Sequence, residues 1–412
     1  MARSVRRGNG GQQTDRVVTV TDRILIEHLY KVFSDAPQPA LQRLAAGASK
    51  EQVLAETGLV VGLNDVSLSV PAGAIYMIMG LSGSGKSTLA RCINRLIEPT
   101  AGRILLDGDD IVAADDGRLR EVRRTRVSMV FQHFALLPHR TVLENVEFGL
   151  KLRGIAARPR RQKAEEILAV VGLARWGHHL PAALSGGMRQ RVGLARALAT
   201  DADVLIMDEA FSALDPLIRT EMQDELLRLQ RTLHKTILFI THDFQEALKL
   251  GTRIAIMADG AVVREGTPQE IVTDPGSDYV AAFTREVDRS RLFDARSVMV
   301  DARPIVARAD GTVELTGASG PGRSFVVDDA GRLIGTVAAA DLPRLQQGIA
   351  LRSLASTDCA TVPGHARLAD IAGACSGGQP VAVVDEDGRL LGRVEPSQIL
   401  ARIAAPAAPL QP

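Results

Sequence analysis

The chain has 412 residues, of which 46% are hydrophobic and 24% are charged, values typical of folded globular proteins rather than disordered or fibrous ones. This length allows two to four domains, each with its own core. The 49 basic and 48 acidic residues nearly cancel, so no overall field favours a nucleic acid or an acidic substrate. The three cysteines lie far apart and form no CxxC pair. This spacing argues against a disulfide framework and a zinc site, and favours a reducing cytoplasm.

The first 20 residues are rich in Gly, Gln and Arg without a hydrophobic period, so we expect a disordered leader over 1–20. They lack the apolar core of a secretory signal. No apolar run anywhere approaches the ~20 residues of a membrane-spanning helix. If the protein serves a membrane process, we expect another chain to do the spanning.

From residue 24 onward, short apolar runs alternate with amphipathic helical segments. Near-continuous apolar runs predict strands of a parallel sheet that is buried on both faces. A long helical region, at about 142–184, separates the second run from the third. The sequence therefore predicts an α/β domain over 21–282 with a helical insert. The five runs lie at 74–79, 127–131, 204–207, 236–240 and 253–257.

The composition changes after residue 283, beyond which there is no lysine. The remainder contains an internal repeat, because VVDDAGRLIGTV at 326–337 returns as VVDEDGRLLGRV at 383–394, an offset of 57 residues. Each copy indicates a strand, a polar turn, a second strand and a helix, and it is too small to bury a core alone. We therefore expect the two copies to pair in one α/β domain. The expected boundaries are 283–295 for a linker, 296–404 for the domain with halves at about 296–346 and 350–404, and 405–412 for a tail.

A glycine-rich segment, GLSGSGKST at 80–88, stands between the apolar run at 74–79 and a helix with apolar spacing. This order predicts a P-loop, in which backbone N–H groups and the helix dipole face phosphate oxygens. We expect Lys86 to reach the β- and γ-phosphates and the Ser87 hydroxyl to complete the ligand shell of Mg²⁺. A structural glycine turn is the alternative. The expected phosphate-site residues are Gly80, Leu81, Ser82, Gly83, Ser84, Gly85, Lys86, Ser87 and Thr88.

The apolar run at 204–207 leads directly into Asp208 and Glu209, at the edge where such sheets bind ligands. We expect Asp208 to hold the metal ion. Glu209 is the candidate general base that polarises an attacking water. Two acidic residues after a strand also serve as plain helix caps, so the interpretation of this pair depends on the P-loop.

Residues 184–188, LSGGM, open the helical segment MRQRVGLARALA. They resemble the signature sequence of ATP-binding cassette (ABC) ATPases, and the region from about 24 to 280 is similar to that family in the order of its motifs. The resemblance implies ATP and Mg²⁺ as cofactors and adds roles for four residues. These are Gln132 as the Q-loop glutamine and a metal ligand, Asp215 in the D-loop, His242 as the switch histidine and Phe33 as the aromatic that stacks on adenine.

Ser185, Gly186 and Gly187 present a hydroxyl and amides at a helix N-terminus, which forms a second anion site. In the family, that site closes over ATP held by the opposite subunit. The resemblance therefore implies a head-to-tail pair of two copies with two ATP molecules between them.

The segment at 49–70, SKEQVLAETGLVVGLNDVSLSV, lies between the aromatic loop and the P-loop strand. Together with GLSGSGKSTL and NRLIEPTAG it resembles the ATPase subunits of importers for glycine betaine, proline and choline. In that group a tandem pair of CBS modules follows the ATPase domain, as the repeat does here. The resemblance implies ATP-driven uptake through separate permease subunits, an indirect link to a substrate-binding protein, a peripheral position on the cytoplasmic face of the membrane, and no nucleic acid.

Alternatives stay open for both domains. The ATPase domain could serve another small solute, a non-transport process or a phosphotransfer reaction, although the single P-loop and the signature argue against the last two. The repeat domain could bind a nucleotide, sense ionic strength or only dimerise. Nucleotide-binding CBS modules tend to end in Gly-apolar-apolar-Thr/Ser-x-x-Asp; the first copy keeps Asp341 but has Ala338 for the hydroxyl, and the second has Glu395 and Gln398.

Overall fold

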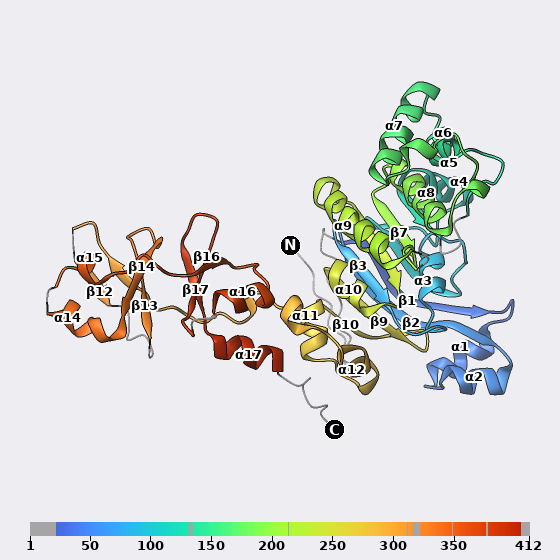
Figure 1. Cartoon of the computed structure of the whole chain (residues 1–412). Coiled ribbons are helices and arrows are strands. Elements are labelled where there is room, and N and C mark those ends of the chain that lie inside the picture. Colours follow the sequence, from blue (N-terminus) through green and yellow to red (C-terminus); the bar gives the residue numbers. More distant parts are fainter. Residues whose placement is uncertain are drawn as a thin grey trace, which may run out of the picture. The chain divides into compact units, whose positions relative to one another are not determined.

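A computed structural model describes residues 22–131, 135–212, 214–310, 312–315, 322–347, 349–375 and 378–404. The expected leader (1–20) and tail (405–412) lie outside these ranges. The chain divides into two compact units, Met1–Glu265 and Gly266–Pro412, and each is described by itself (Figure 1). Within the described ranges, no helix is long and apolar enough to cross a bilayer.

A six-stranded sheet with the order β10-β9-β3-β8-β7-β6 forms the centre of the first unit. Strand β3 pairs in parallel with β8 and β9, and β7 pairs in parallel with β6 and β8. All five apolar runs form strands of this sheet, which confirms the prediction of a parallel α/β core. Every residue of β3, β7 and β8 is buried, as layers on both faces require. The bounds are β3 (Ile75–Met79), β6 (Val127–Val130), β7 (Val204–Asp208), β8 (Thr236–Thr241), β9 (Arg253–Ala258) and β10 (Ala261–Gly266).

A second sheet of the first unit has the order β2-β1-β4-β5, and β1 is antiparallel to both β2 and β4. Its inner side chains join those of the six-stranded sheet in one hydrophobic cluster, so the two sheets share a core. The strands are β1 (Asp22–Phe33), β2 (Val60–Pro71), β4 (Ala101–Leu106) and β5 (Asp109–Asp110). The helices of this part are α1 (Gln38–Ala45), α2 (Lys50–Thr57), α3 (Lys86–Ile93), α4 (Asp116–Thr125), α9 (Pro216–Leu233) and α10 (Phe244–Leu250).

The helical region expected at about 142–184 is helical in the structure. It has its own hydrophobic cluster, in which α5 and α7 pack against α8. Figure 1 shows these helices gathered at one end of the first unit, while α1 and α2 lie at the other. The elements are α5 (Val142–Val146), α6 (Phe148–Leu152), α7 (Ala157–Val170), the short 3₁₀ turns Ala174–Trp176 and Pro181–Ala183, and α8 (Gly186–Ala199).

The second unit begins at Gly266, before the linker expected at 283–295. Three short helices precede its sheets: α11 (Pro268–Thr273), α12 (Asp278–Thr284) and α13 (Arg289–Leu292). The sheets have the orders β12-β11-β13-β14 and β15-β16-β17. The remaining elements are β11 (Ile305–Ala307), β12 (Val313–Leu315), β13 (Arg323–Val327), β14 (Leu333–Ala338), α14 (Leu342–Gln346), α15 (Leu351–Leu354), β15 (Thr361–Pro363), α16 (Leu368–Ala374), β16 (Val381–Val384), β17 (Leu390–Val394) and α17 (Pro396–Ala404).

The two copies of the repeat pack against each other through equivalent positions. Phe325 of the first copy shares a buried cluster with Ala382, which lies 57 residues later in the second copy. The turns also meet, since Leu333 N donates to Gly388 O and Leu390 N donates to Gly331 O, both at 3.0 Å. Each copy thus buries surface that it could not bury alone.

Phe325 is 1% exposed in this shared cluster, so Phe325→Ala should destabilise the second unit by about 3–5 kcal/mol. The only tryptophan of the chain, Trp176, lies in the first unit. In urea, the circular dichroism transition should therefore move to lower concentration while the Trp176 fluorescence transition stays in place. Leu400→Ala, at a 67% exposed residue of α17, is the control and should move neither. An unchanged dichroism transition in Phe325→Ala would contradict the pairing.

Candidate functional site

A cavity of about 960 Å³ opens at the carboxyl edge of the six-stranded sheet. Segments that follow β3, β7, β8 and β9 contribute to its lining, as is general for ligand sites of parallel sheets. The volume lies within the range of about 300–1,000 Å³ that small-molecule sites occupy. Ten of the expected residues line it: Phe33, Leu81, Ser82, Gly83, Gly85, Lys86, Ser87, Thr88, Glu209 and His242.

Glycines shape the loop between β3 and α3. Gly80 has a φ of 149° and Gly85 a φ of 101°, backbone conformations that other residues rarely adopt. A Cβ at Gly80 would collide with the carbonyl oxygen of Met257, and a Cβ at Gly85 would lie 2.6 Å from that of Gly62. The loop can therefore curl into the N-terminus of α3 only with glycine at both positions. This is the backbone cradle expected for phosphate oxygens.

Lys86 begins α3 and is only 5% exposed. Its ammonium donates to the carbonyl oxygens of Gly80 and Leu81, both at 2.8 Å. Burial lowers the pKa of Lys86, and the carboxylates of Glu209 and Asp208 oppose that shift. Phosphate oxygens would be stronger, charge-assisted acceptors than the two carbonyls. The ammonium is thus suitably placed to exchange them for a phosphate group.

Asp208 ends β7 and is fully buried. The Ser87 hydroxyl donates to its Oδ1 at 2.8 Å. Its Oδ2 has no hydrogen-bond partner in the described part of the chain, and the nearest cation is Arg91, whose Nη2 is 3.8 Å away. Burial raises the pKa of Asp208, against the hydrogen bond from Ser87. An unsatisfied carboxylate oxygen beside a hydroxyl is a donor set that fits Mg²⁺, which prefers hard oxygen ligands.

Glu209 and His242 approach each other beside the phosphate loop. The Oε2 of Glu209 is 3.4 Å from the Nδ1 of His242. Glu209 has a φ of 49°, and its backbone is fixed, because its N–H donates to Ile240 O at 3.0 Å and its carbonyl accepts from the Ser212 hydroxyl at 2.9 Å. The arrangement brings a carboxylate and an imidazole to the place where a water could be deprotonated.

The expected signature residues lie elsewhere in the first unit. Ser185 caps α8 by accepting from Met188 N at 3.3 Å, and Gly186 begins that helix. Ser185, Gly186 and Gly187 do not line the P-loop cavity. Asp215 caps α9 by accepting from Ile218 N at 3.1 Å, and it does not line the cavity either. Gln132 lies outside the described residues.

Sequence analysis missed seven residues of the cavity. Lys50, Glu51 and Leu54 come from α2, Val60, Val61 and Gly62 from β2, and Asp259 follows β9. The sequence showed that this segment lies between the aromatic loop and the P-loop strand, but it did not show which side of α2 faces the cavity. Only tertiary packing turns that helix toward the cavity.

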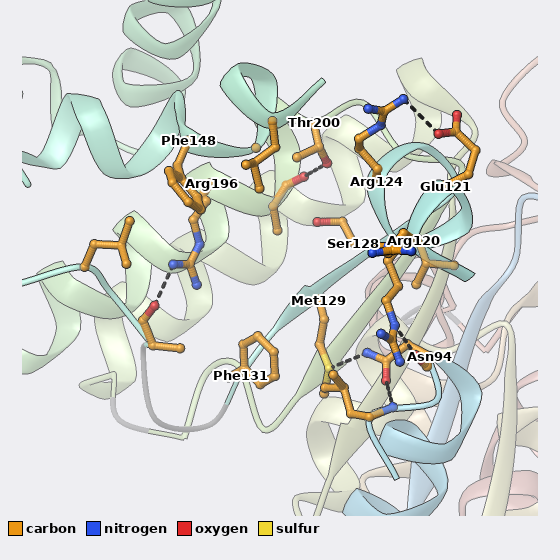
Figure 2. Close-up of a pocket in the computed structure, with 18 of the residues that line it drawn as sticks. Asn94, Arg120, Glu121, Arg124, Ser128, Met129, Phe131, Phe148, Arg196 and Thr200 are labelled. Atoms are coloured by element: carbon orange, nitrogen blue, oxygen red, sulfur yellow. Dashed lines mark hydrogen bonds and ion pairs between the residues drawn. The ribbon is translucent and has the colours of Figure 1, made fainter. Parts of the chain in front are cut away.

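A separate apolar groove of about 820 Å³ lies between the sheet and the helical insert. Figure 2 shows Met129 and Phe131 on the sheet side and Phe148 with Arg196 on the helical side. The guanidinium of Arg196 donates to Ala135 O at 2.6 Å and thereby holds the loop that borders the groove. Burial lowers the pKa of Arg196. Three arginines of α4 also line the groove: Arg120, Arg123 and Arg124.

Asn145 holds the same loop from the opposite end. It is fully buried, and its amide group accepts from Leu137 N at 2.7 Å and donates to Leu137 O, Arg140 O and Thr141 O at 2.9–3.1 Å. The loop before α5 is therefore fixed to the helical insert.

Comparisons with known proteins agree with this geometry. The family model described as ABC transporter matches residues 63–212. The glycine betaine transport ATP-binding protein OpuAA of Bacillus subtilis (strain 168) is 47% identical over 93% of this chain and 92% of its own. The glycine betaine/proline betaine transport system ATP-binding protein ProV of Escherichia coli (strain K12) is 47% identical over 92% of this chain and 96% of its own.

Solved structures support the same fold for the first unit. The ATP-binding cassette MJ0796, solved as a dimer in a post-hydrolysis state with ADP and Pi, is 33% identical with a TM-score of 0.52. The match covers 60% of this chain and 98% of that chain. The first unit thus has the fold of a solved cassette that binds ADP and Pi.

The geometry of Lys86 predicts that Lys86→Ala removes the central cation of the phosphate cradle. Each hydrogen bond to a charged group is worth about 1.5–3 kcal/mol, so the affinity for ATP should fall at least about 10-fold and up to about 100-fold. Titration with a fluorescent ATP analogue measures the loss. Lys163→Ala, which removes an exposed charge of α7, is the control. Equal affinity in the two variants would contradict the placement of the phosphates.

Proposed function

The chain belongs to the ATP-binding subunits of ABC transporters, in the ProV-type group of quaternary amine importers, and we propose that it drives uptake of glycine betaine or a close relative through separate permease subunits. The observation that carries this proposal is the P-loop cavity, which Lys86, Ser87 and Glu209 line, with the buried Asp208 behind it accepting a hydrogen bond from Ser87. Similarity to OpuAA and ProV over more than nine-tenths of the chain supports the class of solute.

In the proposed reaction, the loop amides and Lys86 bind and orient the triphosphate. Ser87 and Asp208 would hold Mg²⁺, which would supply positive charge beside the triphosphate. Glu209 accepts a proton from the water that attacks the γ-phosphorus, and ADP leaves as inorganic phosphate forms. His242, 3.4 Å from Glu209, orients that carboxylate and meets the γ-phosphate. Phe33, 48% exposed at the end of β1, stacks on the adenine.

A second copy completes the site in this proposal. The backbone amides at the start of α8 do not line the P-loop cavity of their own chain, although a helix N-terminus of this kind attracts anions. Two copies in head-to-tail arrangement would bring Ser185, Gly186 and Gly187 of one to the nucleotide of the other, with Asp215 at the same junction. The dimeric state of the solved MJ0796 cassette supports this arrangement.

The groove between the sheet and the helical insert is the proposed docking site of the permease. Its floor is apolar and its rim carries arginines, which suits an amphipathic helix with an acidic face. The loop that Asn145 and Arg196 fix borders this groove and follows Gln132 closely in the sequence, so permease contact and nucleotide state can influence one another. This assembly would place the protein on the cytoplasmic face of the membrane, with a substrate-binding protein on the far side.

We propose that the second unit is a tandem CBS module that regulates or dimerises the transporter, with halves at about 296–346 and 350–404. In the first copy the Asp341 carboxylate accepts from Arg344 at 2.9 Å, so the group that would hold a ribose is already engaged. The second copy has Gln398 at that position, and its amide oxygen accepts from Glu395 N at 2.9 Å. These contacts favour dimerisation or ionic sensing over a ribose-binding role.

Glu209→Gln should bind ATP normally but hydrolyse it about 10²–10⁴-fold more slowly, because the amide cannot accept the proton of the attacking water. Steady-state phosphate release measures turnover, and a fluorescent ATP analogue measures binding. Undiminished hydrolysis would show that another group is the base. The parent protein under the same conditions is the reference.

Uptake of labelled glycine betaine, choline and proline should be measured in cells with and without this gene, at low and raised osmolarity. We expect loss of uptake for at least one of these solutes, and a dependence on osmolarity would assign the second unit a regulatory role. Unchanged uptake of all three would contradict the proposed solute class and leave an ABC ATPase for a different small solute.

A further inference from the structure

We propose that α2, which lies in the insertion between β1 and β2, is a wall of the nucleotide site that holds the purine base opposite Phe33. The inference rests on the proposed function, because it takes ATP as the ligand of the P-loop cavity. It assigns a ligand contact to a segment whose role neither the motifs nor the phosphate chemistry explain.

The first observation is which side chains face the cavity. Lys50, Glu51 and Leu54 occupy neighbouring places on one side of α2 and line the same cavity as Lys86. The spacing of one turn between Lys50 and Leu54 puts both on one face of the helix. An entire helical face is therefore turned toward the nucleotide site.

The second observation is that exposed apolar side chains gather around that cavity. Phe33, Leu54, Val60 and Leu81 all line it, and they are 48%, 49%, 52% and 57% exposed. Large apolar side chains that gather around one cavity while half exposed indicate a surface that a ligand covers. A purine ring offers the flat apolar faces that such side chains bury.

The third observation is that α2 is fixed firmly to the strand that ends in Phe33. Val53, on the other side of α2, is fully buried in a cluster with Val32, Ala40 and Val61. Val32 and Val61 are paired across β1 and β2, and so are Phe33 and Val60. The strand pairing that positions Phe33 therefore also positions the helix that carries Leu54.

Both ends of α2 are capped as well. Ser49 and Gln52 form a reciprocal capping box, and Gly58 ends the helix in the left-handed conformation with a φ of 69°. Arg43 of α1 forms an ion pair with Glu56 of α2. A preorganised wall loses little entropy when a ligand binds, so its contacts contribute to affinity.

Gly62 shows how closely this end of the site is packed. A Cβ at Gly62 would lie 2.8 Å from Cε2 of Phe33 and 3.1 Å from Cγ2 of Thr88. The glycine thus leaves the Phe33 ring its place between β2 and the start of α3. The base would lie on the open side of that ring, between Phe33 and Leu54, with the ammonium of Lys50 beside it.

The test is Leu54→Ala in the full chain. Because Leu54 touches the base and not the reacting phosphates, the affinity for ATP should fall about 5- to 30-fold, and kcat at saturating ATP should stay unchanged. Binding of inorganic tripolyphosphate, which has the phosphates without the base, should not change. Leu54→Met should restore most of the ATP affinity, since it returns a long apolar side chain.

Leu400→Ala, an exposed leucine of the second unit, is the matched control and should leave both affinities at the parent values. Unchanged ATP affinity in Leu54→Ala would overturn the inference. An equal loss for ATP and tripolyphosphate would also overturn it, because the helix would then act on the phosphate end. Failure of the parent chain to bind ATP is a different result, and it would overturn the proposed function itself.

Discussion

Two buried charges at the carboxyl edge of the parallel sheet are the constraint on which the site depends. Lys86 and Asp208 are taken almost completely out of water, which is costly unless each finds a partner. The Lys86 ammonium is satisfied by carbonyls of its own loop, whereas one oxygen of Asp208 has no hydrogen-bond partner among the described residues. The edge of the sheet therefore holds one buried carboxylate oxygen whose desolvation is not compensated by a hydrogen bond within the described residues, and this is where the proposed Mg²⁺ would bind.

This arrangement explains the order of the elements around it. The strands must be short and apolar on both faces to bury the charges, and the loops that follow them must carry all the polar chemistry. In the proposed reaction, phosphate contacts come from the β3–α3 loop, metal contacts from the end of β7 and the start of α3, and base contacts from β1 and α2. Each part of the ligand thus meets a different segment, and the sheet is what brings these segments together.

Much of the first unit could be predicted because its signals are local. The five apolar runs could be assigned as strands because a strand covered on both sides needs no polar positions. The P-loop could be identified because its strand, glycines and helix follow one another directly in the sequence. Leu54 could not be predicted, because its role depends on which way Val53 packs, and Val53 packs against strands far away in sequence. The boundary at Glu265 could not be predicted either, since only the contacts of α11 and α12 assign these helices to the second unit.

The two halves of the second unit also exchange chain segments. Val300, ahead of the first copy, forms a bridge with Arg393 of the second, and Ser356, ahead of the second copy, forms a bridge with Thr336 of the first. Gly335 and Gly392 make room for these crossings, because a Cβ would lie 2.6 Å and 2.8 Å from the carbonyl oxygens of Ser356 and Val300. A chain cut down to one copy would expose a bare sheet edge, and bare edges invite aggregation. A truncation within the duplication should therefore yield insoluble protein rather than a smaller folded module.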